Sequence, residues 1–379
     1  KNSMKNILIT GGAGFIGSKL TKKLVSKGYN VTILDNLSKQ IHGENQDSEL
    51  YKSIKDISTF IFGDVRNKFD WIQALQGQDA VIHLAAETGT GQSMYEITRY
   101  NDVNILGTSH LLNILANESH SIQKMVIASS RSIYGEGKYL CEKDGVVYPN
   151  ERNNIDMAKG IFELICSNCK EKLSLQPTDE NSRIYPSSIY GITKQQQEQM
   201  ILLMGKSLDI PAVALRYQNV YGPGQSLSNP YTGILSIFST RILNGNDIDI
   251  YEDGEESRDF VFINDVVDAT VLALEKEEAN NQIFNVGSGV ATTVSQVANS
   301  LKAFYNSNVN VTISGKFRLG DIRHNYADLS KIKEALGFSP KFDFNSGISE
   351  FVKWVKTQKI KEDKYESSIQ ELKQKGLIK

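Results

Sequence analysis

A glycine-rich turn near the start of the chain constrains the possible folds more than any other feature. An apolar run at 7–10 leads into a G-x-x-G-x-x-G spacing formed by Gly11, Gly14 and Gly17, and a helical pattern follows from about Phe15 to Lys27. Glycine permits a tight turn at position 11, the approach of a pyrophosphate at 14 and close helix–sheet packing at 17. The helix N-terminus, which includes Ile16, would face the anion. The spacing predicts a dinucleotide site, although an ordinary strand-to-helix turn can show it too.

An acidic residue after the second apolar run indicates which dinucleotide would bind. Asp35 ends the run 30–35 and lies eighteen positions after Gly17. A carboxylate there accepts hydrogen bonds from the ribose hydroxyls of NAD and repels the additional phosphate of NADP. Taken with the glycine turn, Asp35 predicts NAD as the cofactor, whereas alone it could simply cap a strand end.

Strand-like runs alternate with helical stretches through the first half of the chain. The runs are Asn6–Thr10, Asn30–Asp35, Thr59–Gly63, Ala80–Leu84, Lys124–Ser129 and, later in the chain, Ala212–Arg216. Such alternation predicts an α/β fold, a Rossmann-type doubly wound parallel sheet with helices on both faces. Ligands bind such sheets at the carboxyl ends of the strands, so the residues after each run are the candidates for function.

Several of these residues suit contacts with a cofactor. Asp64 can accept a hydrogen bond from an adenine amino group, although alone it would be an ordinary turn carboxylate. The small side chains of Ala85 and Ala86 would let the backbone lie against the cofactor. His83 stands in an apolar run, which favours a buried core histidine over a catalyst. Asn104, near the start of a helical stretch at 101–118, could support the active site.

Two distant segments contain candidates for acid–base chemistry. Ser130 follows the fifth run, and Tyr190 and Lys194 are four residues apart, which places them on one face of a helix. A nearby ammonium lowers the pKa of a phenol, so tyrosine can then act as a base near neutral pH. On an isolated helix both would be surface residues, but at the mouth of a dinucleotide-binding sheet catalysis is the better interpretation.

Composition excludes other classes of function. The 379 residues carry a formal net charge of -2, so there is no basic excess for nucleic-acid binding. No apolar run is long enough to span a bilayer and no signal peptide is recognisable, which predicts a cytoplasmic protein without a membrane partner. The three cysteines all lie in one segment and do not form a secreted disulfide framework.

Together the segments resemble the extended short-chain dehydrogenase/reductase family, the nucleotide-sugar epimerases and dehydratases, from about Lys5 to Trp354. The resemblance rests on the glycine turn, Asp35-Asn36, Gly63-Asp64-Val65, His83-Leu84-Ala85-Ala86, the Ser130 segment, Tyr190 with Lys194, the run 215–223, Arg258-Asp259-Phe260-Val261 and Gly320-Asp321-Ile322-Arg323. It implies that Tyr190 is the base, that Lys194 is its partner and a ligand of the cofactor ribose, and that Ser130 makes the second hydroxyl contact.

The resemblance also implies two sets of binding residues. The NAD set is Gly11, Gly14, Phe15, Ile16, Gly17, Asp35, Asn36, Asp64, Val65, Leu84, Ala85, Ala86, Asn104, Tyr190, Lys194 and Gln218. The set for the nucleotide-diphosphate sugar is Thr88, Ser132, Asn219, Arg258 and Arg323. The arginines suit this role because a forked guanidinium pairs bidentately with phosphate.

One departure from the family pattern bears on the reaction. Family 4,6-dehydratases carry Asp-Glu directly after the catalytic hydroxyl residue, where this chain has Arg131 and Ser132. The difference favours 4-epimerisation through a 4-keto sugar, with tightly held NAD. A UDP-hexose 4-epimerase, a 4,6-dehydratase, a 4-keto reductase and, from another class, a non-catalytic NAD-binding protein stay open as alternatives.

An insertion at about 137–183 separates Ser130 from Tyr190. It contains Cys141 and the C-x-x-C pair Cys166 and Cys169, a spacing that suits a structural zinc. The insertion and the segment 91–96 look like the dTDP-L-rhamnose 4-epimerase branch of the family, which makes dTDP-L-rhamnose the expected substrate. In that branch a histidine typically stands where this chain has Asp144. Two alternatives therefore stay open. Either Asp144 is the fourth ligand of a zinc ion, or the loop is metal-free and holds three thiols.

The expected organisation has two domains and a tail. Residues 4–215 and 246–273 form the NAD-binding domain, residues 216–245 and 274–358 the nucleotide-sugar domain, and residues 359–379 a charged tail that is a solvated helix or disordered. A homodimer is expected, since the helix at 101–118 and the helix that starts near Tyr190 resemble the pair that forms a four-helix interface in the family.

Overall fold

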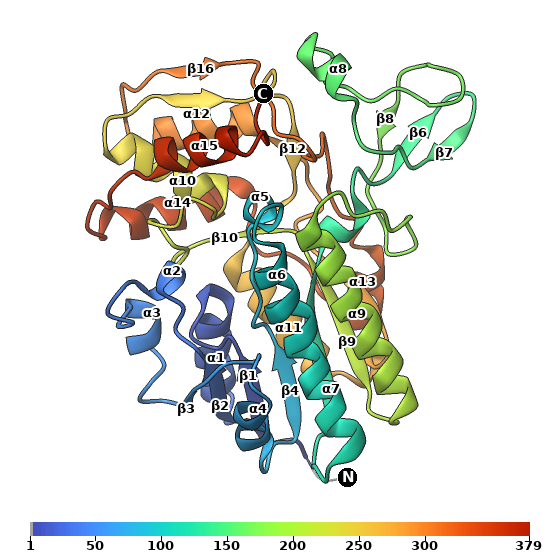
Figure 1. Cartoon of the computed structure of the whole chain (residues 1–379), viewed down its shortest axis with the longest axis vertical. Coiled ribbons are helices and arrows are strands. Elements are labelled where there is room, and N and C mark those ends of the chain that lie inside the picture. The colour runs from blue at the N-terminus through green and yellow to red at the C-terminus, as the bar shows by residue number, and fades with distance from the viewer. Residues whose placement is uncertain (1–2) are drawn as a thin grey trace.

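The computed structural model describes residues 3–379, and its centre is a parallel sheet of seven strands in the order β14-β9-β5-β4-β1-β2-β3 (Figure 1). The strands are β1 (Asn6–Thr10), β2 (Asn30–Asp35), β3 (Thr59–Phe62), β4 (Ala80–His83), β5 (Lys124–Ser130), β9 (Ala212–Tyr217) and β14 (Ile283–Val286). The first six are the strands predicted from the sequence. The strand order reverses between β1 and β4, which opens a crevice at their carboxyl ends.

Helices cover both faces of the sheet because its strands are apolar on both sides. Ile7 and Ile9 of β1 belong to the core cluster that includes Leu20 and Val266, whereas the intervening Leu8 belongs to the cluster that includes Ile201. The helices of the first face are α1 (Phe15–Ser26) and α11 (Ile263–Glu275), and those of the second are α4 (Lys68–Leu75), α7 (Gly107–Asn117) and α9 (Ile189–Ser207). The alternation along β1 thus determines which helices pack on which face.

The helical stretch expected at 101–118 is part of a longer helical segment. It begins with α6 (Ile97–Tyr100), passes through a π-helical segment η1 (Asn101–Leu106) and continues as α7. The wider π turn contains Asn104, whose side chain is fully buried. π-Helical turns inside α-helices often lie at functional sites.

The upper lobe in Figure 1 consists of helices and short strand pairs. Its helices are α10 (Ile234–Leu243), α12 (Val294–Phe304) and α14 (Phe344–Lys356). Its strand pairs are β10 (Asn219–Tyr221) with β13 (Phe260–Phe262), β11 (Ile248–Ile250) with β16 (Val311–Ile313), and β12 (Ser257–Arg258) with β15 (Thr292–Thr293). The expected boundary at 246 differs from the structure, because β11 pairs with β16 in this lobe.

The last part of the central sheet also differs from the expected division. Residues 274–358 were expected in the sugar-binding domain, but β14 pairs with β9 in the central sheet, and α13 (Ser330–Leu336) contacts β14. The short helix η3 (Glu277–Ala279) precedes β14. An isolated apolar run of four residues does not show which sheet it joins.

The insertion forms a small subdomain that projects from the upper right of Figure 1. It contains a three-stranded antiparallel sheet of β6 (Tyr139–Cys141), β7 (Gly145–Val147) and β8 (Ser174–Leu175), together with α8 (Asn154–Ala158). Met157 and Phe162 of the insertion pack against Phe317 of the upper lobe, so the subdomain is attached by an apolar contact as well as by its two chain connections.

The charged tail contains a helix, one of the two expected alternatives, but this helix is docked on the protein instead of being solvated. Residues Tyr365–Gln374 form α15, whose side chains Tyr365, Ile369 and Leu372 are buried against Tyr95 and Ile237. These three residues follow a helical spacing, so a narrow apolar stripe docks the helix while its lysines and glutamates face solvent. None of the helices in residues 3–379 is long and apolar enough to cross a membrane.

Candidate active site

One large cavity, with a volume of about 1240 Å³, lies between the carboxyl ends of the central strands and the upper lobe. A typical small-molecule pocket has roughly 300–1,000 Å³, so this volume suits two ligands side by side. Of the predicted cofactor and substrate residues, these line it: Gly11, Gly14, Phe15, Ile16, Gly17, Asp35, Asn36, Asp64, Val65, Leu84, Ala85, Ala86, Thr88, Ser130, Ser132, Tyr190, Lys194, Gln218, Asn219 and Arg258. Asn104 and Arg323 do not line it.

The glycine turn has no room for side chains. A Cβ atom on Gly17 would lie 2.2 Å from the carbonyl oxygen of Gly11, and Gly11 itself has a φ of +69°. A Cβ on Gly11 would lie 2.9 Å from the backbone nitrogen of Ala85 on the neighbouring strand end. The turn therefore presents bare backbone to the cavity at the N-terminus of α1, as a pyrophosphate site requires.

The carboxylate of Asp35 is fixed beside this turn. It accepts hydrogen bonds from the backbone N–H groups of Leu37 (2.8 Å) and Ala13 (3.0 Å). Burial raises the pKa of Asp35, whereas these two N–H groups and His42, 4.0 Å away, oppose the rise. The carboxylate lines the cavity with the acceptor chemistry that ribose hydroxyls need.

Asp64 stands near Asp35 and is held by other side chains. Both oxygens of Asp64 accept from the guanidinium of Arg66, at 3.0 and 2.7 Å, and one also accepts from the amide of Asn36 at 3.1 Å. Burial alone would raise the pKa of Asp64, but these hydrogen bonds lower it below its usual range. Asp64 is thus a charged acceptor at the rim where an adenine would lie.

The three predicted catalytic residues meet in the cavity. Ser188 caps the N-terminus of α9 by accepting from the N–H of Gly191 at 3.0 Å, which places Tyr190 in the first turn. The side chains of Tyr190 and Ser130 are hydrogen-bonded. Ser130 also accepts from the N–H of Ser132 at 3.1 Å and from its hydroxyl at 2.9 Å. The end of β5 and the start of α9 therefore bring together groups that are far apart in the sequence.

The electrostatic surroundings of Tyr190 combine burial with nearby polar and positively charged groups. Burial raises its pKa, and the opposing influences are the hydrogen bond with Ser130 and the positive charge of Arg131. Lys194, the expected source of that charge, is itself 3% exposed, and burial lowers its pKa to about 7. Tyr190 and Lys194 both line the cavity, on the shared face of α9 that the sequence predicted.

His83 is a structural residue, as expected. Its ring is 2% exposed and bonds on both sides, to the Thr10 hydroxyl through Nδ1 at 2.6 Å and to the Thr108 hydroxyl through Nε2 at 3.0 Å. Burial, with the nearby Lys194, lowers the pKa of His83 to about 3, so the ring is neutral at pH 7.

Asn104 was predicted to contact the cofactor and instead holds the wall of the site. Its carbonyl oxygen accepts from the N–H of Glu87 at 2.8 Å, and its amide donates to the Glu87 carbonyl (3.1 Å) and to the Thr193 hydroxyl (3.0 Å). These bonds join the loop after β4 to α9. A fully buried amide with all of these partners satisfied supports the active site without reaching a ligand.

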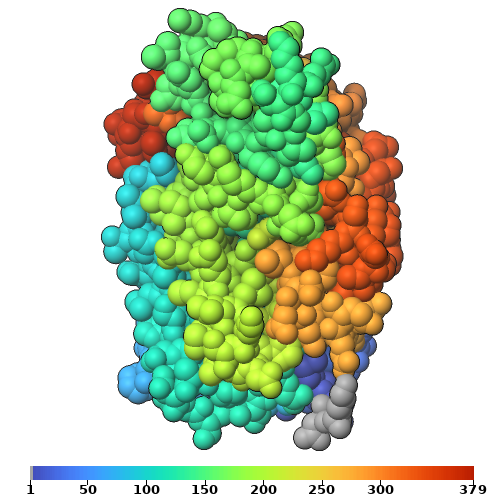
Figure 2. Space-filling view, turned by 90° about the vertical axis from the view of Figure 1, so that its right-hand side faces the viewer, coloured from blue at the N-terminus to red at the C-terminus, as the bar shows by residue number. Residues whose placement is uncertain are grey.

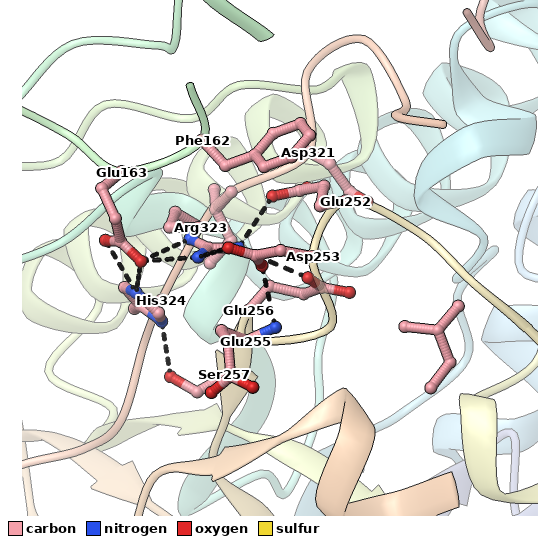
Figure 3. A network of polar contacts seen from close by, with 12 residues as sticks. Phe162, Glu163, Glu252, Asp253, Glu255, Glu256, Ser257, Asp321, Arg323 and His324 are labelled. Atoms are coloured by element: carbon pink, nitrogen blue, oxygen red, sulfur yellow. Dashed lines mark hydrogen bonds and ion pairs between the residues drawn. The ribbon is translucent and has the colours of Figure 1, made fainter. Parts of the chain in front are cut away.

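Arg323 was predicted to hold the diphosphate, but carboxylates already surround its guanidinium (Figure 3). It is 1% exposed and pairs with Glu163 of the insertion at 2.6 Å and with Asp253 at 2.7 Å, with Glu252 and Glu256 also in range. A guanidinium so neutralised has no free fork for phosphate. Arg323 connects the insertion to the upper lobe instead.

Arg152 makes a second link of the same kind. Its guanidinium donates to Glu252 at 2.8 Å and to the backbone carbonyl of Asp321 at 2.9 Å. Both groups belong to the upper lobe. Arg152, Glu252 and Arg323 form one ion-pair network, and all three are buried. The insertion is thus fixed to the lobe that faces the cavity.

The predicted metal ligands gather in one place. Ligand atoms of Cys141, Asp144, Cys166 and Cys169 all lie within 4.8 Å of one another. Cys141 and Asp144 belong to the β6–β7 hairpin, and Cys166 and Cys169 to a turn in which the N–H of Lys170 donates to the carbonyl of Cys166 at 3.0 Å. Two turns with the same two-residue spacing thus bring three thiols and one carboxylate close together.

Comparison with known proteins agrees with this geometry. The profile of the NAD dependent epimerase/dehydratase family matches residues 7–287, most of the chain. The chain belongs to this family. A dTDP-L-rhamnose 4-epimerase of Burkholderia thailandensis is 35% identical over 93% of the chain and 95% of its own length. The family and the Rossmann-type fold expected from the sequence are therefore confirmed.

Solved structures of the family also match along nearly their whole length. A UDP-glucose 4-epimerase of Thermotoga maritima with UDP-glucose has a TM-score of 0.74 at 30% identity, covering 93% of this chain and 99% of its own. A UDP-glucuronic acid 4-epimerase of Bacillus cereus, solved with UDP-glucuronic acid and NAD, has a TM-score of 0.74 at 25% identity, covering 93% and 99%. These relatives act on different sugars, so the family does not determine the substrate.

Some cavity residues were not predicted from the sequence. Arg318, Glu256 and side chains of α15, including Ile369 and Leu372, line the cavity. Arg318 precedes Gly320, which has a φ of +81° and reverses the chain before Arg323. The spacing shows two arginines around this glycine but not which of them turns towards the cavity. In α15, the helical spacing of the apolar residues was a signal for docking, but the many charged residues of the tail obscured it.

Proposed function

We propose that this chain catalyses NAD-dependent 4-epimerisation of a nucleotide sugar, with dTDP-L-rhamnose as substrate and dTDP-6-deoxy-L-talose as product. The observation that carries the proposal is the meeting of Ser130, Tyr190 and Lys194 inside one cavity that has room for a dinucleotide and a sugar nucleotide. The similarity to the dTDP-L-rhamnose 4-epimerase supports the choice of sugar.

The residues of the site suit the steps of such a reaction. When bound, NAD supplies a reversible hydride acceptor, so net redox is zero. Tyr190 takes the proton of the sugar 4-hydroxyl, and the hydroxyl of Ser130 orients the same oxygen. Arg258 and Arg318 hold the diphosphate, and Thr88, Ser132 and Asn219 lie along the same wall. Tyr190 returns the proton after the 4-keto sugar has turned in the pocket.

The alternatives within the family differ in their products. A 4,6-dehydratase uses an acid and a base after the catalytic hydroxyl, whereas here Arg131 and Ser132 line the cavity at those positions. A 4-keto reductase would consume reduced cofactor. A non-catalytic NAD-binding protein would have no use for a half-buried tyrosine that lines the cavity and is hydrogen-bonded to a serine.

A panel of nucleotide sugars tests the proposal. The purified protein is incubated with dTDP-L-rhamnose, UDP-glucose, UDP-glucuronic acid and UDP-N-acetylglucosamine without added NAD(H), and the products are separated by chromatography. We expect the 4-epimer of dTDP-L-rhamnose at the highest kcat/KM. A 4-keto product, a need for stoichiometric NADH or a preference for a UDP-sugar would each replace this assignment.

We also propose one structural zinc in the insertion. Three thiolates and a carboxylate form a donor set that zinc accepts, and a small loop with little apolar content gains stability from such a crosslink. The group at the fourth position, Asp144, is exposed, so its carboxylate keeps access to solvent. Bound zinc would hold the two turns together and would take no part in the chemistry.

Elemental analysis of protein purified without chelator tests the zinc. We expect about one zinc per chain, its loss in Cys166→Ser and a lower melting temperature before any loss of activity at moderate temperature. The exposed Ser167→Ala, within the same turn, is the matched control and should keep the metal. Absence of metal together with three titratable thiols would show that packing alone holds the loop.

A homodimer through α6, α7 and α9 is the third part of the proposal. Exposed apolar side chains lie on α6 at Ile97, on the adjoining η1 at Leu106 and on α9 at Ile192 and Leu203. Figure 2 shows this face, with α9 beside the α6–α7 segment and the insertion above them. Apolar side chains spread over neighbouring helices are typical of a protein interface.

A further inference from the structure

The charged tail, residues 359–379, forms part of the cavity wall. Its helix α15 turns an apolar stripe inward, and Ile369 and Leu372 line the cavity although they are 6% and 5% exposed. Side chains that are packed this closely and still border the cavity give that part of the wall a fixed shape. The contacts of the tail show which half of the active site this wall belongs to.

Leu372 of the tail lies near the catalytic end of the cavity. A Cβ atom on Gly91 would lie 3.7 Å from Cδ2 of Leu372, so the leucine packs against α5 (Thr90–Ser93), to which Gly91 belongs. At the end of α5 the hydroxyl of Ser93 accepts from the backbone N–H of Tyr190 at 3.0 Å. One short helix therefore separates the wall formed by α15 from the residue that we propose as the base.

A second contact joins α15 to the loop at 224–233, every residue of which lines the cavity. In this loop the Tyr231 hydroxyl donates to the carboxylate of Glu371 on α15 at 2.6 Å and accepts from the Tyr95 hydroxyl at 2.9 Å. Tyr231 also packs against the loop after β4, because a Cβ on Gly89 would lie 3.4 Å from the Cβ of Tyr231. Glu371 thus holds an aromatic residue of the cavity wall in one position.

A third contact joins the end of the tail to Arg318, the arginine that the proposed function places at the diphosphate. Residues 377–379 pair with residues 317–319 in antiparallel fashion, with N–H to carbonyl hydrogen bonds of 2.9 to 3.0 Å. The guanidinium of Arg318 lies 5.4 Å from the ring centroid of Tyr251, whose hydroxyl is 3.5 Å from that of Tyr365 on α15. The tail therefore supports Arg318 directly through the backbone and, by way of Tyr251, through the side chain.

We propose that the tail completes the sugar-nucleotide half of the active site, with Glu371 as a positioning residue that acts through Tyr231. The inference rests on the proposed function, which assigns this half of the cavity to a sugar nucleotide. The tail contacts three of its walls, namely α5, the loop at 224–233 and the segment that carries Arg318. The proposed NAD site instead depends on the glycine turn and on Asp35, at strand ends of the central sheet. A disturbed tail should therefore weaken binding of the sugar nucleotide and leave NAD bound.

This arrangement links docking of the tail to binding of the sugar nucleotide. A ligand that binds only while the tail is docked lowers the population in which the tail is detached. The detached tail is exposed to proteases, so its rate of cleavage reports that population.

Limited proteolysis of the unmodified protein tests the link without any turnover. Trypsin can cleave after four lysines between residues 361 and 375, and mass spectrometry follows the loss of the tail. NAD-loaded protein is digested alone and with UDP-glucose, UDP-glucuronic acid, UDP-N-acetylglucosamine or dTDP-L-rhamnose. We expect the sugar nucleotide that binds to slow the loss about tenfold at ten times its Kd, because the detached population falls by the factor 1 + [L]/Kd. Cleavage after the exposed Lys159 in the insertion is the internal control and should not change.

Kinetics of Glu371 variants test the positioning role. Glu371→Met removes the acceptor of the Tyr231 hydroxyl and keeps a side chain of similar length. We expect KM for the sugar nucleotide to rise roughly three- to tenfold, with kcat and NAD content little changed, since part of a hydrogen bond to a charged group is lost to binding. Glu371→Gln keeps an oxygen that can accept and should restore most of the KM. Glu366→Met, at a 73% exposed position of the same helix, is the matched control and should leave KM unchanged.

A double-mutant cycle shows whether Glu371 acts through Tyr231. Tyr231→Phe removes the hydroxyl that donates to the carboxylate, so it should raise KM by a similar factor. Adding Glu371→Met to Tyr231→Phe should then raise KM little further, because both substitutions break the same hydrogen bond. Multiplication of the two separate effects would contradict a shared role.

Two further results would overturn the proposal. The first is loss of the tail at the same rate with and without a saturating sugar nucleotide, and the second is an unchanged KM in Glu371→Met or an equal rise in Glu366→Met. If dTDP-L-rhamnose is not the substrate, a different sugar nucleotide protects the tail, so that failure is distinguishable from failure of this inference.

Discussion

At the scale of single residues, the site depends on side chains whose partners come from distant parts of the chain. Tyr190 and Ser130 were predictable because the resemblance and the strand ends pointed to both. It was not predictable that Arg318 lines the cavity while Arg323 does not. Arg323 is neutralised by Glu163 and Asp253, which lie far away in the sequence. Spacing within one segment cannot reveal such long-range pairs.

Replacement of Tyr190 by phenylalanine should separate binding from catalysis. The variant keeps the ring and loses the hydroxyl that is bonded to Ser130. We expect turnover to fall about 10²–10⁴-fold while NAD stays bound, because general-base catalysis contributes on that order. The measurement is kcat together with the NAD content of the purified protein. Near-normal turnover would remove Tyr190 from the mechanism.

Asp35 should determine the preference for NAD over NADP. Asp35→Ala removes the charge and both acceptors, whereas Asp35→Asn removes the charge but keeps one oxygen, which can accept from only one of the N–H groups of Ala13 and Leu37. We expect NAD to bind roughly ten- to a hundredfold more weakly in Asp35→Ala, as for loss of a hydrogen bond to a charged group. Discrimination against NADP should relax in both variants. Calorimetric titration with both cofactors checks this, and unchanged NAD affinity would show that Asp35 does not reach the ribose.

At the scale of elements, the bounds of the six predicted strands agree with the structure within one residue. They follow strong apolar runs that end in glycine or polar residues, so local pattern and tertiary environment agree. The run Ile283–Val286 is too short for its pattern to show that it joins the central sheet. In the tail, abundant lysine and glutamate concealed the stripe that docks α15.

The docking of α15 should matter for both stability and substrate binding. Ile369 is buried against Ile237 of the upper lobe and also lines the cavity, while its neighbour Gln370 is exposed. Ile369→Asp buries a charge and should cost about 3 kcal/mol or more of unfolding free energy and raise KM. Gln370→Asp, which adds the same charge on the solvent side, should change stability by less than about 0.5 kcal/mol. The measurements are the unfolding free energy from thermal unfolding and the KM of both variants. Equal effects of the two substitutions would mean that α15 is not docked.

At the scale of the whole molecule, the predicted division into two lobes needed two corrections, at β11 and at β14. Both arise because the chain crosses between the lobes several times after residue 216, and a sequence does not show where each crossing ends. The face formed by α6, α7 and α9 is a property of this scale too, since no single helix displays it.

A charge on that face should break the proposed homodimer. Leu203 is 65% exposed on α9, so Leu203→Glu costs little in the folded monomer but would place a charge in the interface. We expect the dimer dissociation constant to rise roughly tenfold or more. Ile313→Glu, on β16 of the upper lobe and also exposed, is the control and should leave the dimer intact. Light scattering over a range of concentrations distinguishes the two; a monomeric parent protein at micromolar concentration would contradict the interface.

The pairing of β14 with β9 has a consequence for how the protein is made. On the ribosome, residues 212–217 emerge well before residues 283–286, so β9 stays an open edge while the segment between them is translated. An unpaired edge strand is a template for association with other chains. Nascent chains are therefore most prone to aggregate during that interval, and truncated products that end before residue 283 would retain the open edge permanently.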